Sequence, residues 1–441
     1  MSETLCPPLN VRKAALVVLG AVACFHGAYS TPLGFLIFGY VACLVQLARL
    51  RTTRLAFYFG LVAGLLCFAP QLEFFWRIFG RGALALWVVL AFWIALFTAL
   101  MHLALVRFGL FRASLLAPFL WTGLEYFRSE LYALRFSWLN VGYALSGGRV
   151  PFGAVGDYGI GFIAVFLAAL FLARQFKLMV LTFIVSLGYM TILMFLRHSS
   201  QTLPLQVAGV QMEFPTESEV ILNLGDLVKH FPGAQLLVLS EYTLEGPVPA
   251  KLKQWCRENG KYLIVGGKDP APNNAYYDTA FVVGPAGEVV FKQAKSVPLQ
   301  FFDDGLPAKE QRVWDSPWGK IGICICYDLS YTRVTDRLIR LGSQALIVPT
   351  MDVERWGGHE HELHRRVALT RAAEYGVPVF RVGSSGISQS VNCFGGEDST
   401  APFPGDGATI SAELNIGPVG QLPLDRVLAP LSVAVTAGFI A

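Results

Sequence analysis

The chain has 441 residues, of which 54% are hydrophobic and 15% are charged, and its formal net charge is +4. This length allows two or three domains, and the apolar share exceeds that of an ordinary soluble protein. The small net charge, with no basic block, argues against nucleic acid as a partner.

Apolar residues are concentrated before residue 198, where hydrophobic runs follow one another along the chain. This pattern predicts a multi-span α-helical membrane domain over residues 1–198. Several runs are shorter than the ~20 residues that a full crossing needs, so their edges are less well defined than their centres. The seven predicted spans are 12–28, 32–48, 55–70, 83–106, 113–127, 159–173 and 178–196.

Basic residues lie in the short connections at alternate ends of these spans. The positive-inside rule makes those ends cytoplasmic. Seven crossings then place the chain after residue 198 on the outer side of the membrane. The residues that set this orientation are Arg12, Lys13, Arg49, Arg51, Arg54, Arg107, Arg112, Arg174 and Lys177.

One predicted outer-side region, residues 121–161, is rich in Trp, Tyr, Gly and charged residues. Glu125 inside an apolar run is costly unless it is paired or faces a cavity, and Arg128 on the same helical face is a candidate partner. Aromatic and basic residues at span ends also serve as interfacial anchors, so that interpretation stays open. The alternative is a lipid-facing cleft lined by Glu125, Arg128, Trp138 and Tyr143.

After Leu205 the pattern changes to short β runs separated by helical stretches. Alternating strands and helices predict layered α/β packing over residues 199–424. Strands are predicted at 206–212, 236–239, 262–266, 279–283, 289–292, 321–325, 345–349 and 377–382. Helices are predicted near 217–231, 248–259, 333–342 and 359–376.

The run from Lys320 to Tyr331 predicts a buried strand that delivers Cys326 to a sharp turn before a helix near Thr332. A thiol at such a turn has its sulfur exposed and the next backbone N–H groups available, which suits a covalent acyl intermediate. The alternative is that Cys326 packs as a small buried hydrophobic residue, as free cysteines commonly do.

Two further predicted strands are followed by ionisable residues that can take part in catalysis, Glu241 and Lys295. A carboxylate, an amine and a thiol just past three strand ends can meet at one edge of a sheet. The carboxylate would take the thiol proton, and the ammonium would lower the thiol pKa and stabilise an oxyanion. The alternatives are a solvated strand end for Glu241 and a protective edge-strand charge for Lys295.

These residues match a known pattern. The second half of the chain resembles the nitrilase (carbon–nitrogen hydrolase) superfamily, and the whole chain resembles the bacterial apolipoprotein N-acyltransferase family. The resemblance implies a multi-span membrane domain joined to an outward-facing, four-layer α-β-β-α sandwich. It covers nearly the full length and is carried by the motifs at 121–128, 137–143, 156–161, 325–328, 371–381 and 385–388.

The resemblance implies a Glu–Lys–Cys triad that falls on Glu241, Lys295 and Cys326. It implies that the thiolate takes an acyl chain from a membrane phospholipid, and that the α-amino group of a lipoprotein's diacylglyceryl-cysteine then attacks the thioester. Lys295 and the backbone N–H of Tyr327 would hold the acyl oxyanion. We expect a monomer in the bacterial inner membrane, without a cofactor.

The chain departs from the family pattern near the site. Asp328 follows Tyr327 where the family usually has Glu, and Asp303 is the predicted auxiliary carboxylate in place of a Val-Pro-Phe-Gly-Glu element. Lys292 stays a rival of Lys295 for the catalytic position. The Asn-Asp-x-Trp-Phe-Gly element becomes residues 351–357, in which Trp356 is expected to line the substrate cleft.

Three histidines, His359, His361 and His364, resemble a metal cluster. Their spacing does not put three ligands on one helical face, so we predict a solvated helix start and no metal site. The tail, residues 425–441, resembles the family's last span. From Val427 it would extend ~22 Å as a helix, less than the ~30 Å hydrocarbon core, and is predicted as a short membrane segment.

Two other functions fit parts of this pattern. A membrane-tethered amidase would use the same triad with water or ammonia in place of the amine. A non-enzymatic scaffold or lipoprotein-binding relative would not need Cys326.

The predicted orientation is testable with a reporter enzyme fused at residue 200. A reporter that is active only outside the cytoplasm should be active there, because seven crossings separate that point from the cytoplasmic end. A reporter fused after Arg112 is the matched control and should report the cytoplasm. Cytoplasmic activity at residue 200 would overturn the predicted topology.

Overall fold

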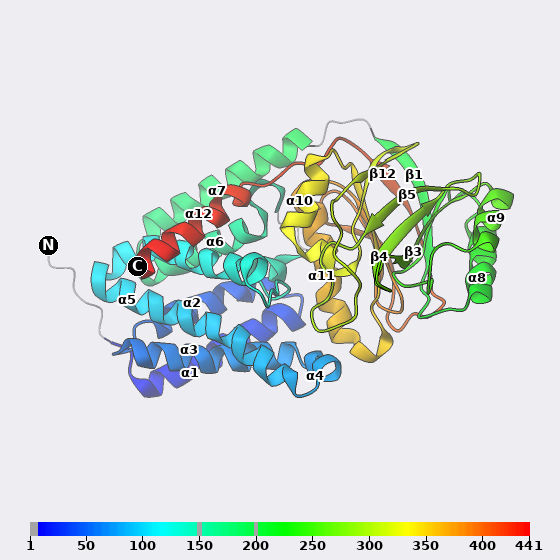
Figure 1. The fold of residues 1–441 in the computed structure, drawn as a ribbon. Helices are drawn as coiled ribbons and strands as arrows, with labels where there is room; N and C mark the ends of the chain where they lie inside the picture. Colours follow the sequence, from blue (N-terminus) through cyan, green and yellow to red (C-terminus); the bar gives the residue numbers. More distant parts are fainter. Residues whose placement is uncertain (1–7, 148–151, 198–201) are drawn as a thin grey trace. The chain divides into compact units, whose positions relative to one another are not determined.

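The computed structural model describes residues 8–147, 152–197 and 202–441 (Figure 1). The described residues form two compact units. Among the described residues, one unit comprises 8–146, 152–196 and 423–441, and the other comprises 147, 197 and 202–422. The predicted domain boundary at 198 and 199 lies outside the described residues.

The first unit is helical. Four of its helices are long and apolar enough to cross a membrane: Val11–Ser30, Thr53–Gln71, Gly82–Leu131 and Phe152–Leu172. Each of the seven predicted spans falls on a helix of this unit, whereas the short α4 was not predicted. The helices are α1 Val11–Ser30, α2 Ile37–Leu47, α3 Thr53–Gln71, α4 Phe74–Phe79, α5 Gly82–Tyr126, α6 Phe152–Leu172, α7 Phe176–Arg197 and α12 Asp425–Ile440.

Two glycines break long helices of this unit. Gly109 in α5 has φ 76° and ψ 172°, and Gly156 in α6 has φ 76° and ψ 177°. Residues with a Cβ rarely adopt positive φ, so a kink of this kind favours glycine. The break at Gly109 falls between the predicted spans 83–106 and 113–127, so α5 consists of two helical segments that correspond to these two spans.

The C-terminal helix α12 packs within this unit. The Asp425 carboxylate accepts a hydrogen bond of 3.0 Å from the Tyr158 N–H, just after the kink in α6. Farther along, the Thr436 hydroxyl donates to the Phe119 carbonyl of α5 at 3.1 Å. Its 16 residues extend ~24 Å, so α12 is shorter than the ~30 Å hydrocarbon core, as the sequence predicts.

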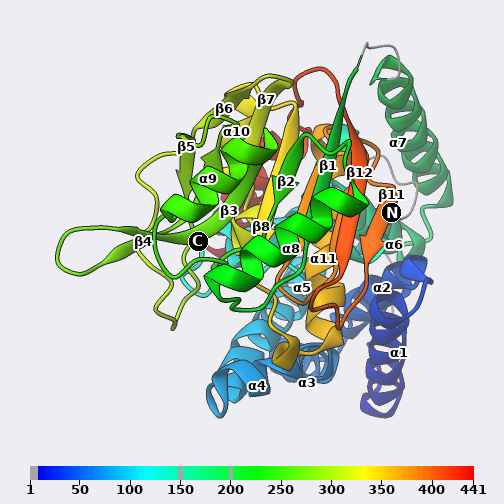
Figure 2. The ribbon, with the colours of Figure 1, turned by 90° about the vertical axis from the view of Figure 1, so that its right-hand side faces the viewer.

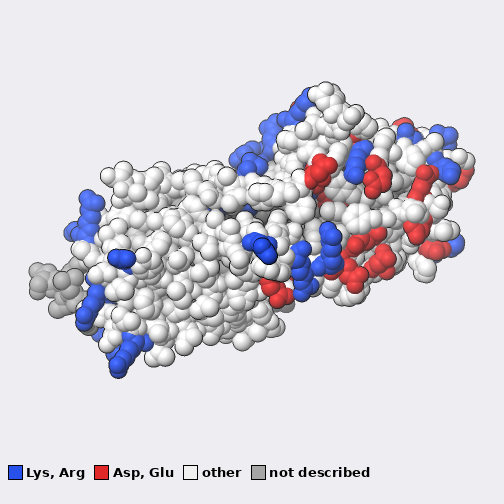
Figure 3. Space-filling view, turned by 60° about the horizontal axis from the view of Figure 1, so that its bottom comes forward, with Lys and Arg blue, Asp and Glu red and all other residues white. Residues whose placement is uncertain are grey.

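Charged side chains are distributed unequally over the two units. In Figure 3 the visible face of the helical unit is largely free of charge, with Lys and Arg gathered at one end, whereas the other unit carries both signs. Exposed apolar residues line the outer faces of the helices, for example Leu16, Val88 and Phe183. An apolar surface of this kind suits a lipid environment rather than water.

The second unit contains two six-stranded sheets, with strand orders β12-β1-β2-β3-β4-β5 and β11-β10-β9-β8-β7-β6. The first sheet consists of β12 Thr409–Ile416, β1 Leu203–Val210, β2 Leu236–Val238, β3 Tyr262–Pro270, β4 Tyr276–Val283 and β5 Val289–Ala294. The second consists of β11 Glu397–Ala401, β10 Ser388–Val391, β9 Val379–Gly383, β8 Ala345–Thr350, β7 Gly319–Ile323 and β6 Val313–Ser316.

The two sheets pack face to face between two helical layers (Figures 1 and 2). Helices α8 Glu217–His230 and α9 Ala250–Asn259 cover the first sheet, and α10 Thr332–Arg340 and α11 Gly358–Tyr375 cover the second. Buried side chains from both sheets form one core, including Val207, Val238, Ile323 and Phe380. The predicted four-layer α-β-β-α sandwich is confirmed.

Four strands were not predicted, namely β6, β10, β11 and β12. Three of them are short or polar, as in Glu397–Ala401, which forms the edge of its sheet. In β12, Ile410 and Leu414 alternate with exposed or half-buried polar residues, a pattern that does indicate a half-buried strand.

Arg371 of α11 supports the turn that follows Cys326. Its side chain is fully buried, its Nε donates to the Leu329 carbonyl at 3.1 Å, and its Nη2 donates to the Ser330 carbonyl at 2.9 Å. A third donor, Nη1, pairs with the Glu374 carboxylate. The fork of a guanidinium meets three acceptors that one ammonium cannot meet together.

Replacing Arg371 with Lys should therefore destabilise the second unit. Carbonyls left without donors in the interior cost about 1–3 kcal/mol each, and each kcal/mol lowers the Tm of a domain of this size by roughly 2–4 °C. Thermal unfolding in detergent measures this. Arg365→Lys is the matched control, because Arg365 pairs with Glu362 and Glu397 at the surface of the same helix. Equal melting of both variants and the wild type would contradict this role.

Candidate active site

Lys295 lies at the centre of a buried ionic cluster. Its Nζ is 2.7 Å from Glu241 Oε1, 2.7 Å from Asp304 Oδ2 and 3.6 Å from Asp278 Oδ2. The sheet explains this meeting, because Ala294 at the end of β5 pairs with Thr279 near the start of β4. Burial would lower the pKa of Lys295, but Glu241 and Asp304 raise it well above its usual value. The surrounding carboxylates therefore favour the charged form of Lys295.

Glu241 and Cys326 meet at the backbone of Met351, which follows β8. The Met351 N–H donates to Glu241 Oε2 at 2.7 Å, and the Met351 carbonyl lies 3.9 Å from Cys326 Sγ. Glu241 comes from the first sheet and Cys326 from the second, so one residue positions both. The structure thus brings Glu241, Lys295 and Cys326 together, and their action as a triad stays a prediction.

The Cys326 thiol is neutral at rest. Burial raises the pKa of the thiol well above its usual value, the charge of Glu241 raises it further, and Lys295 opposes the rise. A thiol in this state needs a base to become a nucleophile. Glu241 is the carboxylate whose charge acts most strongly on it.

Cys326 occupies a strained turn. Its φ is +50°, and the 3₁₀ helix Cys326–Ser330 begins at this residue. A non-glycine residue with positive φ is uncommon and marks a position held by its surroundings. The Tyr327 ring packs edge-to-face against Tyr331 at 5.0 Å, which orients the peptide expected to face the oxyanion.

Asp328 connects this turn to the segment after Lys295. Its carboxylate accepts hydrogen bonds from the Ser296 N–H at 2.9 Å and the Val297 N–H at 2.7 Å. Burial raises the pKa of Asp328 to about 6, against the effect of these donors. Asp328 therefore has a positioning role between Lys295 and Cys326.

The structure corrects the predicted auxiliary carboxylate from Asp303 to Asp304. The Asp304 side chain is buried and accepts from the Tyr242 hydroxyl at 2.7 Å and the Leu299 N–H at 2.5 Å, in addition to Lys295. The side chain of Asp303 is exposed. Two adjacent residues of a loop point to opposite sides, and the sequence offers no periodic pattern there to tell them apart.

Lys292, the rival of Lys295, lies on the surface of the sheet. Its Nζ pairs with the Asp269 carboxylate at 2.9 Å, and its side chain is half exposed. Asp278, by contrast, was missed. It stands inside the strand run Tyr276–Val283, and the signal that the sequence offers is an acidic residue among uncharged ones. The fold buries this side chain completely.

The comparisons with known proteins agree with this geometry. The family described as "Apolipoprotein N-acyltransferase N-terminal domain" matches residues 19–170, and "Carbon-nitrogen hydrolase" matches residues 214–402. An apolipoprotein N-acyltransferase of Geobacter metallireducens is 24% identical over 88% of this chain and 86% of its own length. The chain belongs to the apolipoprotein N-acyltransferase family, within the nitrilase superfamily.

Several other curated relatives are amidases that match a smaller part of the chain. The omega-amidase NIT2 of Xenopus tropicalis is 26% identical over 31% of this chain and 59% of that protein. The chain thus spans about half the length of the curated amidases that it matches. Among solved structures, Saccharomyces cerevisiae Nit3 is 21% identical, with a TM-score of 0.42, over 48% of this chain and 90% of that chain.

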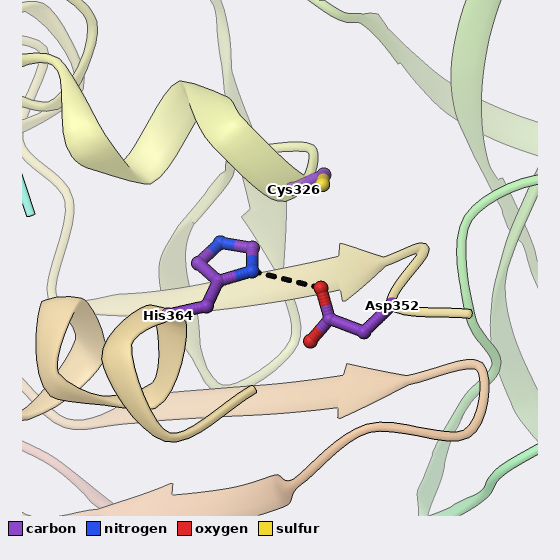
Figure 4. Close-up of side chains that lie close together, drawn as sticks. All are labelled: Cys326, Asp352 and His364. Atoms are coloured by element: carbon purple, nitrogen blue, oxygen red, sulfur yellow. Dashed lines mark hydrogen bonds and ion pairs between the residues drawn. The ribbon is translucent and has the colours of Figure 1, made fainter. Parts of the chain in front are cut away.

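A second buried cluster lies next to the Cys326 thiol. Figure 4 shows Cys326, Asp352 and His364 side by side, with one ligand atom of each within 4.8 Å of the others. His364 Nδ1 lies 2.8 Å from Asp352 Oδ1, and Arg381 donates to Asp352 Oδ2. Burial alone would raise the pKa of Asp352, but Arg381 and His364 hold it well below its usual range.

This cluster fixes the Met351 peptide that meets the triad. The N–H of Asp352, the next residue, donates to the Ser384 hydroxyl at 3.0 Å, and its carbonyl accepts from Ser384 and Ser385. The ionised Asp352 is also held by the Arg381 guanidinium. Asp352 is therefore a positioning residue for the catalytic loop.

The prediction of a solvated helix start is wrong for two of the three histidines. His361 and His364 are buried, because residues three apart on α11 face the interior together. Glu360 lies 2.7 Å from His361 Nδ1, and Asp352, Glu360 and His361 also converge within 4.8 Å. The Arg381 guanidinium, which pairs with Asp352, already supplies a positive charge to the cluster of Asp352, Glu360 and His361. The third histidine, His359, is half-buried.

The predicted cleft residues of the helical unit are all buried. Glu125 Oε1 accepts from the Val141 N–H at 3.0 Å, and Arg128 donates to Asn140 Oδ1 at 2.5 Å. Both line a small pocket with Tyr40, Phe68, Trp93, Phe97 and Trp121.

Three other cleft candidates are packing residues in their own units. Trp138 packs against the rings of Phe74 and Phe136, and Tyr143 is fully buried. Trp356, in the second unit, is also buried. A role for these side chains in a substrate cleft stays a prediction.

The pair Asp304→Asn and Asp303→Asn tests the corrected assignment. Asp304→Asn removes a charge that holds Lys295 in place, so it should slow the proposed acylation of Cys326 about a hundredfold, which corresponds to roughly 3 kcal/mol in activation free energy. The exposed neighbour is a matched control and should stay within about twofold of wild type. Intact-protein mass spectrometry of the acylated thiol measures both rates. A large loss in Asp303→Asn with none in Asp304→Asn would restore the sequence assignment.

Proposed function

We propose that this chain transfers a fatty acyl chain from a membrane phospholipid, through a thioester on Cys326, to the α-amino group of a lipoprotein's N-terminal diacylglyceryl-cysteine. The observation that supports it is the convergence of Glu241, Lys295 and Cys326 around the Met351 backbone, in a member of this family. The apolar helical unit supports a lipid as the acyl donor.

The first half-reaction forms the thioester. Glu241 takes the proton from Cys326 Sγ, and the thiolate attacks the ester carbonyl of the phospholipid. Negative charge develops on the carbonyl oxygen, where Lys295 and the Tyr327 N–H would stabilise it. The C–O bond to the glycerol then breaks, and Glu241 returns its proton to the leaving alkoxide, which gives a lysophospholipid.

The second half-reaction forms the amide. The neutral α-amino group of the lipoprotein attacks the thioester carbonyl, and Glu241 takes a proton from the nitrogen. The C–S bond breaks, and the Cys326 thiolate recovers the proton from Glu241. Lys295 keeps its charge throughout, so it acts as an electrostatic stabiliser and Glu241 is the group that carries protons.

The proposal includes location and assembly. A phospholipid donor and a lipoprotein acceptor require the second unit to stand at the outer face of the bacterial inner membrane. The helical unit would hold it there as a monomer. Glu241 contacts both Lys295 and the Met351 backbone of the same chain, which supports a site that is complete in each monomer.

A membrane-tethered amidase is the second candidate. Amidases such as the omega-amidase of Xenopus tropicalis share the second unit's sequence. In that case water would attack the thioester, and no lipid would be needed.

Mass spectrometry of a lipoprotein N-terminus tests the proposal. A third acyl chain should appear with the wild-type chain and be absent with Cys326→Ser. A serine hydroxyl is much less acidic than a thiol, so Glu241 would activate it far less well as a nucleophile. Cys324→Ser, two residues earlier, is the matched control and should retain acylation. A third chain in all three strains would refute the proposal. Hydrolysis of small amides without thioester formation from phospholipid would favour the amidase.

A further inference from the structure

Asp278 is the third carboxylate around Lys295, and the proposed mechanism gives it no task. It lies on β4, its side chain is fully buried, and neither carboxylate oxygen accepts a hydrogen bond from a donor among the described residues. Its cation is Lys295 at 3.6 Å, which two other carboxylates approach to 2.7 Å.

Charge alone requires a proton in this cluster. Oxygens of Glu241, Asp278 and Asp304 lie within 4.8 Å of one another, and all three residues are at most 5% exposed. If all three were ionised, a single ammonium would face three negative charges. Buried carboxylates that share one site do not all ionise. Protonating one of them costs less free energy than burying a negative charge that no cation compensates.

Hydrogen bonds indicate which carboxyl holds that proton. Asp304 accepts from Lys295, the Tyr242 hydroxyl and the Leu299 N–H. Glu241 accepts from Lys295 and the Met351 N–H. These donors stabilise the ionised forms of both residues. Asp278 has no such donor among the described residues, so it is the carboxyl that is least able to carry a negative charge.

A bound metal ion does not explain the cluster. Three converging carboxylates are a common cation site, but Lys295 Nζ already stands 2.7 Å from two of them. A divalent ion at the same place would be repelled by that ammonium. A proton on Asp278 relieves the excess negative charge without displacing Lys295.

We propose that Asp278 is protonated at neutral pH and donates a hydrogen bond to Glu241, as a positioning residue that holds the Glu241–Lys295 pair beside Cys326. Its role in acyl transfer rests on the function proposed above. The carboxyl hydrogen of Asp278 would orient Glu241 toward the thiol while leaving it ionised. Deprotonation would place a second unshielded charge against Glu241 and pull Lys295 toward Asp278.

The electrostatics of the site agree with this assignment. Burial and then the charge of Glu241 raise the pKa of Asp278 well above its usual range, against the effect of Lys295. The groups that face Asp278 are Glu241, Lys295, Asp304 and Tyr242, with Cys326 next to the first two. Burial and the charges of Asp278 and Asp304 also raise the pKa of Tyr242, which keeps its hydroxyl a donor.

The sign of the pH effect follows. The unfolded carboxyl ionises near ~3.9, whereas the folded one keeps its proton to much higher pH. Within that window the unfolded state binds fewer protons, so the contribution of Asp278 to stability falls as the pH rises from the unfolded pKa to the folded one.

Asp278→Asn is the decisive variant, because an amide is neutral, nearly isosteric and able to donate to Glu241. At pH 7 its rate of Cys326 acylation by phospholipid should stay within about threefold of wild type, while Asp278→Ala should fall about tenfold or more. On the alkaline side the wild-type rate should decline at a pH where the Asn variant still reacts. Asp269→Asn on the neighbouring strand is the matched control.

Infrared spectroscopy detects the proton without any assay of activity. The difference spectrum between wild type and Asp278→Asn at pH 7 should contain the C=O stretch of a protonated carboxylic acid. An ionised-carboxylate signal in its place, or an Asn variant as slow as the Ala variant, would overturn the proposal. If the wild type forms no thioester from phospholipid, the proposed function fails, and the infrared result still decides whether Asp278 is protonated.

Discussion

The buried ion pair between Lys295 and Glu241 is the interaction on which the site depends. Taking both charges out of water costs several kcal/mol each, and this cost is offset only when geometry and further hydrogen bonds are favourable. Here the 2.7 Å contact is supplemented by Asp304 on the lysine side and the Met351 N–H on the glutamate side. Each supporting group comes from a different strand end or loop, so the pair exists only when the sandwich is complete.

The sandwich also explains why the thiol stays neutral until substrate arrives. Cys326 follows a strand of the second sheet, whereas Glu241 and Lys295 follow strands of the first. Met351 contacts Glu241 through its N–H and Cys326 through its carbonyl. Burial favours the thiol over the thiolate, and the positive φ of Cys326 is maintained by Arg371 and Asp328 behind the turn. Strain and desolvation at the nucleophile are therefore offset by structure elsewhere.

The placement of the candidate residues could be predicted from the sequence, because they follow strand runs whose periodicity is clear. Cys326, Glu241 and Lys295 each stand just past such a run, and strand ends gather at the edge of a sheet. Periodicity does not extend into loops, which is why Asp303 was chosen over Asp304. It also does not report which side chains share a proton or a cation. Asp278, His361 and His364 acquire their roles from burial, and burial is a property of the fold.

The proposed triad by itself does not decide between hydrolysis and transfer, since water and an amine would attack the proposed thioester by the same steps. Water is far more concentrated than any lipoprotein, so transfer prevails only where the thioester is kept from water and the amine is held beside it. Glu241, Lys295 and Cys326 are at most 6% exposed, which limits the access of free water. An acyl chain that stays in an apolar environment would add to this exclusion.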